Sequence, residues 1–178
     1  MGHGMEGASH GVGNGSAGNG GVASGRIGND SAGKSGAGAS GCVVIRTGGS
    51  YDGKQGLSLS TGISEASAGS RALCLHVITI PAGTRGTPHL HDGHETAIWI
   101  AGGEVEVWHG PGLIGRTSLR AGDFLYVPPG TPHLPVNKSG TDAIAVIART
   151  DPAEQESVVV LDLPPHLHDL AALPVAAG

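Results

Sequence analysis

The sequence predicts an all-β fold, an antiparallel sandwich or barrel, on three observations. From Cys42 onward, short runs rich in Val, Ile and Leu are separated by Gly and Pro, which is typical of strands joined by turns. Helical periodicity is nearly absent, and only Pro165–Leu173 could form a brief helix. The runs are numerous and regularly spaced, as in sandwiches and barrels. The expected strands are Cys42–Arg46, Ala72–Ile80, Thr96–Ile100, Val105–His109, Phe124–Val127, Ala143–Ala148 and Ser157–Leu161.

Composition divides the chain near residue 41. Glycine accounts for 15 of the first 41 residues, and most of the others are Ser, Ala and Asn. Such a segment has too little apolar surface to offset the entropy lost on ordering it. We therefore expect a disordered Gly/Ser-rich tail over residues 1–41, a single barrel domain over 42–165 and a C-terminal tail over 166–178.

Two glycine motifs in the N-terminal tail match nucleotide-binding formulas. Residues 28–35 fit the phosphate-binding loop, and residues 13–18 fit the dinucleotide-binding loop. Both formulas require a buried strand before the loop and a helix after it, because the helix N-terminus binds the phosphate. Neither motif is flanked by a hydrophobic run, so we expect no nucleotide site here.

Charge and hydropathy limit the classes of partner and the compartment. The net charge of -5 argues against nucleic acid or an anionic membrane as a partner. No stretch approaches the roughly 20 apolar residues of a membrane helix, and the N-terminus lacks the apolar core of a secretory signal. Cys42 and Cys74 form no CxxC pair and are expected to be simple buried hydrophobic side chains. We expect a cytoplasmic protein that binds neither nucleic acid nor membrane.

The first candidate site begins at His89. On an extended strand, His89 and His91 point to the same face, where two imidazoles can bind one ion. The residues alone leave the third ligand open. A two-residue turn at Asp92–Gly93 would pair His91 with His94 and turn Glu95 away, whereas a three-residue loop ending at His94 would bring Glu95 to the same face.

A second candidate lies at His133, which follows the Pro-rich bend of residues 128–132 at the start of another extended run. Together with the first cluster, it resembles the two motifs of the cupin superfamily. The first motif is Gly, five residues, His-x-His, three or four residues, Glu, six residues and Gly; the second is Gly, five residues, Pro-x-Gly, two residues, His, three residues and Asn. The matching residues are Gly83, His89, His91, Glu95 and Gly102, then Gly122, Pro128, Gly130, His133 and Asn137.

The resemblance covers roughly residues 70–150 and implies the double-stranded β-helix, or jelly-roll barrel, of a small single-domain, RmlC-like bacterial cupin. It also implies that Glu95, and not His94, joins His89, His91 and His133 around a metal ion inside the barrel. Three neutral imidazoles and one carboxylate suit Mn, Fe, Co, Ni or Zn and leave coordination positions open. Burying four ionisable groups together without a cation would be costly.

We therefore expect a divalent-metal-binding cupin that acts as a small metalloenzyme, of dioxygenase, isomerase or cyclase type, on a small organic substrate. The alternative is a metal-dependent module that binds or senses a small molecule without converting it. Family resemblance also implies a homodimer. No catalytic residue can be named outside the ligand set.

Three further residues are candidates for substrate contact. Trp99 shares the strand parity of Glu95, Tyr126 lies on the next run, and His76 lies on a strand before the first motif. Ordinary packing is the alternative for each of them, because aromatic side chains usually serve cores. Asn137 is expected to cap a turn through its side chain and not to contact the metal.

Overall fold

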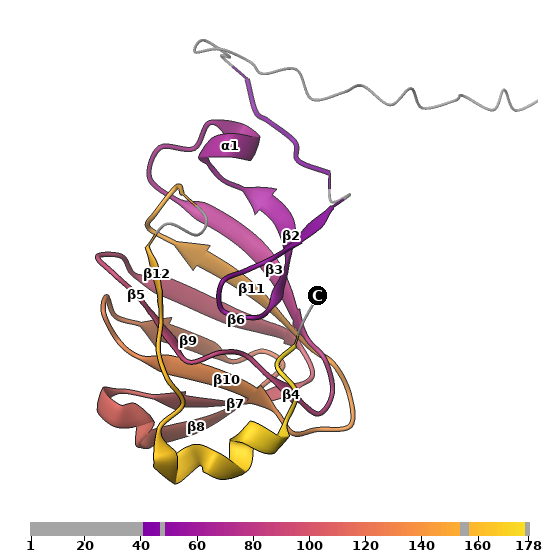
Figure 1. Cartoon of the computed structure of the whole chain (residues 1–178). Helices are drawn as coiled ribbons and strands as arrows, with labels where there is room; N and C mark the ends of the chain where they lie inside the picture. Colours follow the sequence, from indigo (N-terminus) through magenta and orange to yellow (C-terminus); the bar gives the residue numbers. More distant parts are fainter. Residues whose placement is uncertain (1–40, 47–48, 154–156, 177–178) are drawn as a thin grey trace, which may run out of the picture. The chain divides into compact units, whose positions relative to one another are not determined.

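The computed structural model describes residues 41–46, 49–153 and 157–176, which belong to one compact unit. The Gly-rich segment up to residue 40, with both glycine motifs, lies outside the described residues. Two antiparallel β-sheets make up the domain (Figure 1). The all-β architecture of antiparallel sheets, expected from the sequence, is thereby confirmed.

Both sheets are built from strands that are distant in the chain. The first has the order β1-β2-β3-β11-β6-β9, and the second has the order β12-β5-β10-β7-β8, with β4 also paired to β10. The strands are β1 Ser50–Asp52, β2 Ser58–Ile63, β3 Cys74–Ile80, β4 Thr84–Arg85, β5 His89–His91, β6 Thr96–Gly102, β7 Glu104–His109, β8 Gly115–Arg120, β9 Phe124–Val127, β10 His133–Asn137, β11 Ala143–Arg149 and β12 Val158–Val160. The helices are α1 Glu65–Ala68 and the 3-10 helices η1 Pro111–Leu113 and η2 Pro165–Ala172.

The main core lies between the two sheets. Alternate residues of β3, β6 and β11 are buried, and their side chains pack with those of β7 and β8 from the other sheet. Alternation follows from strand geometry, since successive side chains point to opposite faces. The core residues include Ile78, Ile100, Ala145, Val107 and Leu119.

A second, smaller core lies on the outer face of β10. Leu134 and Val136 point away from the barrel interior and pack with Leu167 and Leu170 of η2, which runs as the yellow helical segment in Figure 1. All five residues of β10 are consequently buried. The sequence suggests that residues 166–178 are a tail, but they pack on the barrel as far as residue 176. The cause is the apolar contact of the two η2 leucines with β10.

Most of the expected strands are confirmed within two residues, as β3, β6, β7, β9, β11 and β12, and the brief helix is confirmed as η2. The strand expected at Cys42–Arg46 is wrong: these residues pair with no strand, and Val43 and Val44 are exposed. Strand β8 was not expected, because its sequence is mostly polar and only Leu119 is buried. Among the described residues, no helix is long and apolar enough to cross a lipid bilayer.

Asn137 caps the turn after β10, as expected. Its buried Nδ2 donates hydrogen bonds to the carbonyl oxygens of Ile80 (2.8 Å) and Thr141 (2.9 Å). Its Oδ1 accepts from the amide (3.0 Å) and the hydroxyl (2.7 Å) of Ser139. The side chain therefore connects the end of β10 to the end of β3.

Replacing Asn137 by Ala should lower the free energy of unfolding by about 3 kcal/mol, because several hydrogen bonds are lost and buried carbonyl groups are left without a donor. Urea denaturation followed by circular dichroism measures the change. Ser139→Ala is the matched control and should cost about 1 kcal/mol, since it removes one partner only. Equal stability of the two variants would contradict the capping role.

Candidate metal centre

Three histidines from two neighbouring strands converge inside the barrel. His89 and His91 lie on β5, and His133 begins β10, where it pairs directly with His89. One ring nitrogen from each residue lies within 4.8 Å of the others, and the ring centroids are 4.2–5.1 Å apart. All three side chains are at most 4% exposed. The expected convergence of these three imidazoles is therefore present.

Backbone carbonyl groups orient two of the rings. The Nδ1–H of His89 donates to the oxygen of Thr87 (2.8 Å), and that of His133 donates to the oxygen of Thr131 (3.0 Å). Since a carbonyl only accepts, the proton is on Nδ1 and the lone pair is on Nε2. Metal-bound histidines typically make such a second hydrogen bond. The buried Nδ1 of His91 has no hydrogen-bond partner among the described residues, and these donor atoms fit a divalent ion.

Burial keeps the three imidazoles uncharged. It lowers the pKa of His133 to about 4 and holds the pKa values of His89 and His91 well below the usual range. The neighbouring histidines and the Arg149 guanidinium lower the pKa of His91 further. At neutral pH all three rings are therefore neutral, which is the form that binds metal.

Glu95 is not part of this cluster, which corrects the expected ligand set. Its side chain is exposed, and its Oε1 accepts a hydrogen bond from the Tyr126 hydroxyl (2.8 Å). The main chain fixes this orientation: the Glu95 amide donates to Thr150 Oγ1 (3.0 Å), and the Thr150 amide donates to the Glu95 oxygen (3.2 Å). Because Thr96 faces the interior, its predecessor must face outward.

Thr96 and Arg149 occupy the interior positions next to the histidines. They are directly paired across β6 and β11, and their side chains are 1% and 3% exposed. The Thr96 hydroxyl has no hydrogen-bond partner among the described residues. An arginine and a threonine, not a glutamate, thus occupy the interior positions of β6 and β11 next to the histidines.

The histidines open into a small cavity between the sheets, with a volume of about 40 Å³. Gln55, Thr96 and Arg149 contribute the other polar side chains of its lining. The rest is apolar and comes from the main core, with Ile98, Leu125 and Pro135 in addition. A space of this size holds an ion and a few water-sized groups.

His94 is a buried neighbour of the site. Its ring centroid is 4.8 Å from that of His91, and its Nδ1 lies 3.6 Å from Asp151 Oδ2, too far for a hydrogen bond. Burial lowers the pKa of His94, so this ring is neutral as well. Neither hairpin considered from the sequence forms, because β5 and β6 belong to different sheets. The chain crosses between the sheets at Asp92–Glu95.

None of the three candidates for substrate contact lines the cavity. Trp99 and Tyr126 lie on the outer face of the first sheet and are 41% and 58% exposed. Trp99 lies near Phe124, with ring centroids 6.4 Å apart. His76 is buried on β3, edge-to-face with the ring of Tyr51 at 6.2 Å. The sequence analysis did not identify Thr96, Gln55 and Arg149 as residues of the site. Thr96 could have been found, because it alternates with Ile98 and Ile100 on the same face of its strand.

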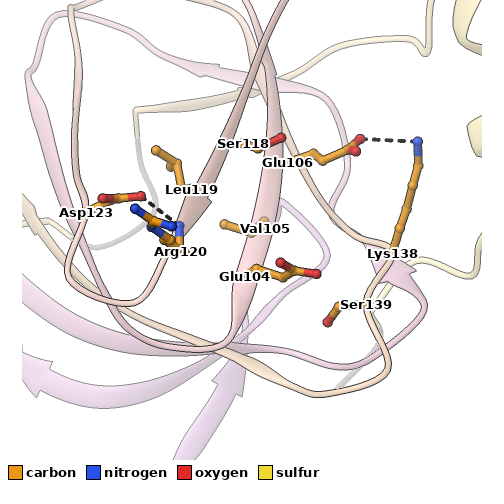
Figure 2. Close-up of a pocket in the computed structure, with 9 residues that line it drawn as sticks. All are labelled: Glu104, Val105, Glu106, Ser118, Leu119, Arg120, Asp123, Lys138 and Ser139. Carbon is orange, nitrogen blue, oxygen red and sulfur yellow. Dashed lines mark hydrogen bonds and ion pairs between the residues drawn. The ribbon is translucent and has the colours of Figure 1, made fainter.

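A larger hollow, of about 500 Å³, lies around the start of β7 and the end of β8 (Figure 2). Three of its charged side chains have partners. Lys138 Nζ lies 3.2 Å from Glu106 Oε2, and Asp123 accepts a hydrogen bond from the Arg120 amide (2.9 Å). Because its lining includes none of the three histidines, this hollow is separate from the candidate metal centre.

Residues 76–148 match a protein-family model described as a Cupin domain. This chain carries a cupin domain. The matched region contains all three clustered histidines, together with most of β3, all of β4 to β10 and most of β11. No curated protein matches the chain.

Solved structures agree on the fold. The polyketide cyclase RemF from Streptomyces resistomycificus has a TM-score of 0.53 at 18% identity, covering 74% of this chain and 87% of that one. Oxalate decarboxylase from Lactobacillus farciminis, as a formate complex, has a TM-score of 0.54 at 15% identity, covering 64% and 33%. Peruvianin-I, a cysteine peptidase from Thevetia peruviana latex, has a TM-score of 0.53 at 16% identity, covering 67% and 74%.

At these identities the likeness concerns the fold, and the three proteins differ in activity, so the fold does not specify the chemistry. For several matched structures, including the oxalate decarboxylase, the chain spans less than two thirds of their length. Function must therefore be argued from the residues of the site.

Replacing His91 by Ala should lower the metal content of the purified protein at least about tenfold. Loss of a residue that only hydrogen-bonds to a metal ligand already lowers metal affinity about 10–100-fold, and loss of a ligand itself should cost at least as much. Glu95→Ala should retain full metal content, since Glu95 faces outward. Elemental analysis after loading with one equivalent of Co(II), in protein purified without an affinity metal, measures both.

The exposed His166 provides a matched control, and His166→Ala should bind metal as the unaltered chain does. Loss of metal from Glu95→Ala to the level of His91→Ala would show that the carboxylate is a ligand after all and would contradict the three-histidine set.

Proposed function

We propose that this cupin binds one divalent transition-metal ion through His89, His91 and His133 and acts as a small metalloenzyme on a small organic substrate. One observation carries the proposal: three buried, neutral imidazoles present ring nitrogens within 4.8 Å of one another. First-row ions such as Mn, Fe, Co, Ni and Zn accept this donor set.

The residues of the chain supply three functions. The histidines hold the ion and leave the positions of a five- or six-coordinate ion that face the cavity open to water or substrate. The carbonyls of Thr87 and Thr131 fix the ring orientations through Nδ1. The apolar walls exclude bulk water, which strengthens electrostatic interactions inside. When bound, the ion supplies Lewis acidity toward a substrate oxygen atom.

Cavity size restricts the substrate. About 40 Å³ admits the reactive end of a molecule or a ligand of a few non-hydrogen atoms. Of the reaction types expected for compact cupins, dioxygenation or isomerisation of a small molecule therefore fits the space better than cyclisation of a large chain.

A non-catalytic, metal-dependent binding or sensing module is the second candidate. The small and largely apolar cavity supports it, because such a space can hold a small ligand while offering few polar groups that could act on it. The homodimer and the cytoplasmic location expected from the sequence stay predictions.

An oxygen electrode separates these possibilities. Protein loaded with Fe(II) should consume oxygen with at least one member of a panel of small enols and hydroxy acids, whereas His91→Ala should not. Conversion of a panel member by Zn(II)-loaded protein, followed by NMR, would indicate isomerisation, since Zn(II) is redox-inert. Ligand-dependent thermal stabilisation without any product, with either metal, would support the binding module instead.

A further inference from the structure

Arg149 gives the cavity its charge. Of the residues that line the cavity within the described part of the chain, Arg149 alone is charged at neutral pH, and none is acidic. The histidines are neutral, and the nearby carboxylate of Glu95 is directed outward to Tyr126. The interior is therefore positive before any metal binds.

Register on β11 explains how an arginine reaches this position. Ala143, Ala145 and Ile147 are the preceding inward residues of the strand, and Arg149 continues their alternation. Its cross-strand neighbours are Thr96 on β6 and Cys74 on β3, both buried. The other inward positions of β11 are apolar, so Arg149 is the one residue of this strand that places a positive charge on the cavity wall, where an anionic ligand can reach it. A guanidinium has five N–H donors, so it can keep a contact within the protein and still bind an anion.

Two other side chains of the cavity lining carry buried polar atoms. Thr96 Oγ1 and Gln55 Oε1 are buried, belong to cavity-lining side chains and have no hydrogen-bond partner among the described residues. A hydroxyl can donate to an anionic oxygen, and an amide oxygen can accept from a ligand hydroxyl. These atoms are the partners that a small oxygen-rich ligand would use.

We propose that the cavity binds a small organic anion, a carboxylate or an enolate, whose oxygen atoms contact Arg149 and Thr96. This inference rests in part on the proposed function, because an ion held by three neutral imidazoles keeps its full double charge. The anion then neutralises both the ion and the guanidinium. Planar guanidinium groups match carboxylates with two parallel hydrogen bonds, and the cavity volume of about 40 Å³ restricts the anion to a few atoms near the metal.

Acetate and acetamide test the inference, because they have nearly the same shape and differ in charge. Isothermal titration calorimetry of the full chain, with and without Co(II), should show acetate binding at least about tenfold more tightly than acetamide. Arg149→Met should abolish this preference in the metal-free chain and weaken it in the Co(II)-loaded chain, where the ion still attracts the carboxylate. The control Arg120→Met, at an exposed arginine on β8, should leave the preference unchanged.

Arg149→Lys covers the case in which the Met variant does not fold. Lysine keeps the charge but loses the planar pair of donors, so acetate should bind several-fold more weakly while acetamide binding stays the same. Equal affinities for acetate and acetamide in the unaltered chain, or an unchanged preference in a folded Arg149 variant, would overturn the inference.

Failure of the proposed function gives a different result. If the chain takes up no Co(II) but still prefers acetate, the proposed metal function is wrong and the anion site stands. If the chain takes up Co(II) without preferring acetate, the metal site stands and the anion inference is wrong.

Discussion

The antiparallel register between β6 and β11 determines which side chains meet inside the barrel. Thr96 lies opposite Arg149, and from this pair the alternate residues Ile98 and Ile100 of β6 and Ile147 and Ala145 of β11 also line the cavity. A shift of β6 by one residue would exchange the two faces of that strand. Glu95 would then lie inward on the same face as Arg149, and the two opposite charges would offset each other. The hydrogen bonds between Glu95 and Thr150 hold the register at this end.

Fold class and the histidine cluster could be predicted from the sequence because both depend on local patterns. Apolar runs between turn residues indicate strands. The His-x-His spacing places two imidazoles on one face of a strand, whichever strand pairs with it. The strand at Cys42–Arg46 fails because β-propensity does not supply a neighbouring strand. Strand β8 could not be predicted from apolar runs, because a strand at the edge of a sheet can form with a single buried side chain, here that of Leu119.

Glu95 was misplaced because the family spacing has two solutions in this sequence. With three residues after the second histidine, the motif pairs Glu95 with Gly102; with four, it pairs position 96 with Gly103. The structure follows the second, since Thr96 faces inward and Gly103 makes the turn at φ 73°. A Cβ on Gly103 would lie 2.4 Å from the Asp142 oxygen, so only glycine fits there. Two adjacent glycines conceal this difference in a sequence.

The cover that η2 forms over β10 sets the size of the folding unit. Excision of the family-matched region alone would strip Leu134 and Val136 of their leucine partners and present a bare apolar face on the strand that begins with His133. Such faces invite aggregation. The last turns of the chain are also tied to the barrel at Arg85, through Leu170, Pro174 and Ala176. For this cupin, the smallest autonomous piece therefore extends well past the family-matched region, to the segment that covers the barrel from outside.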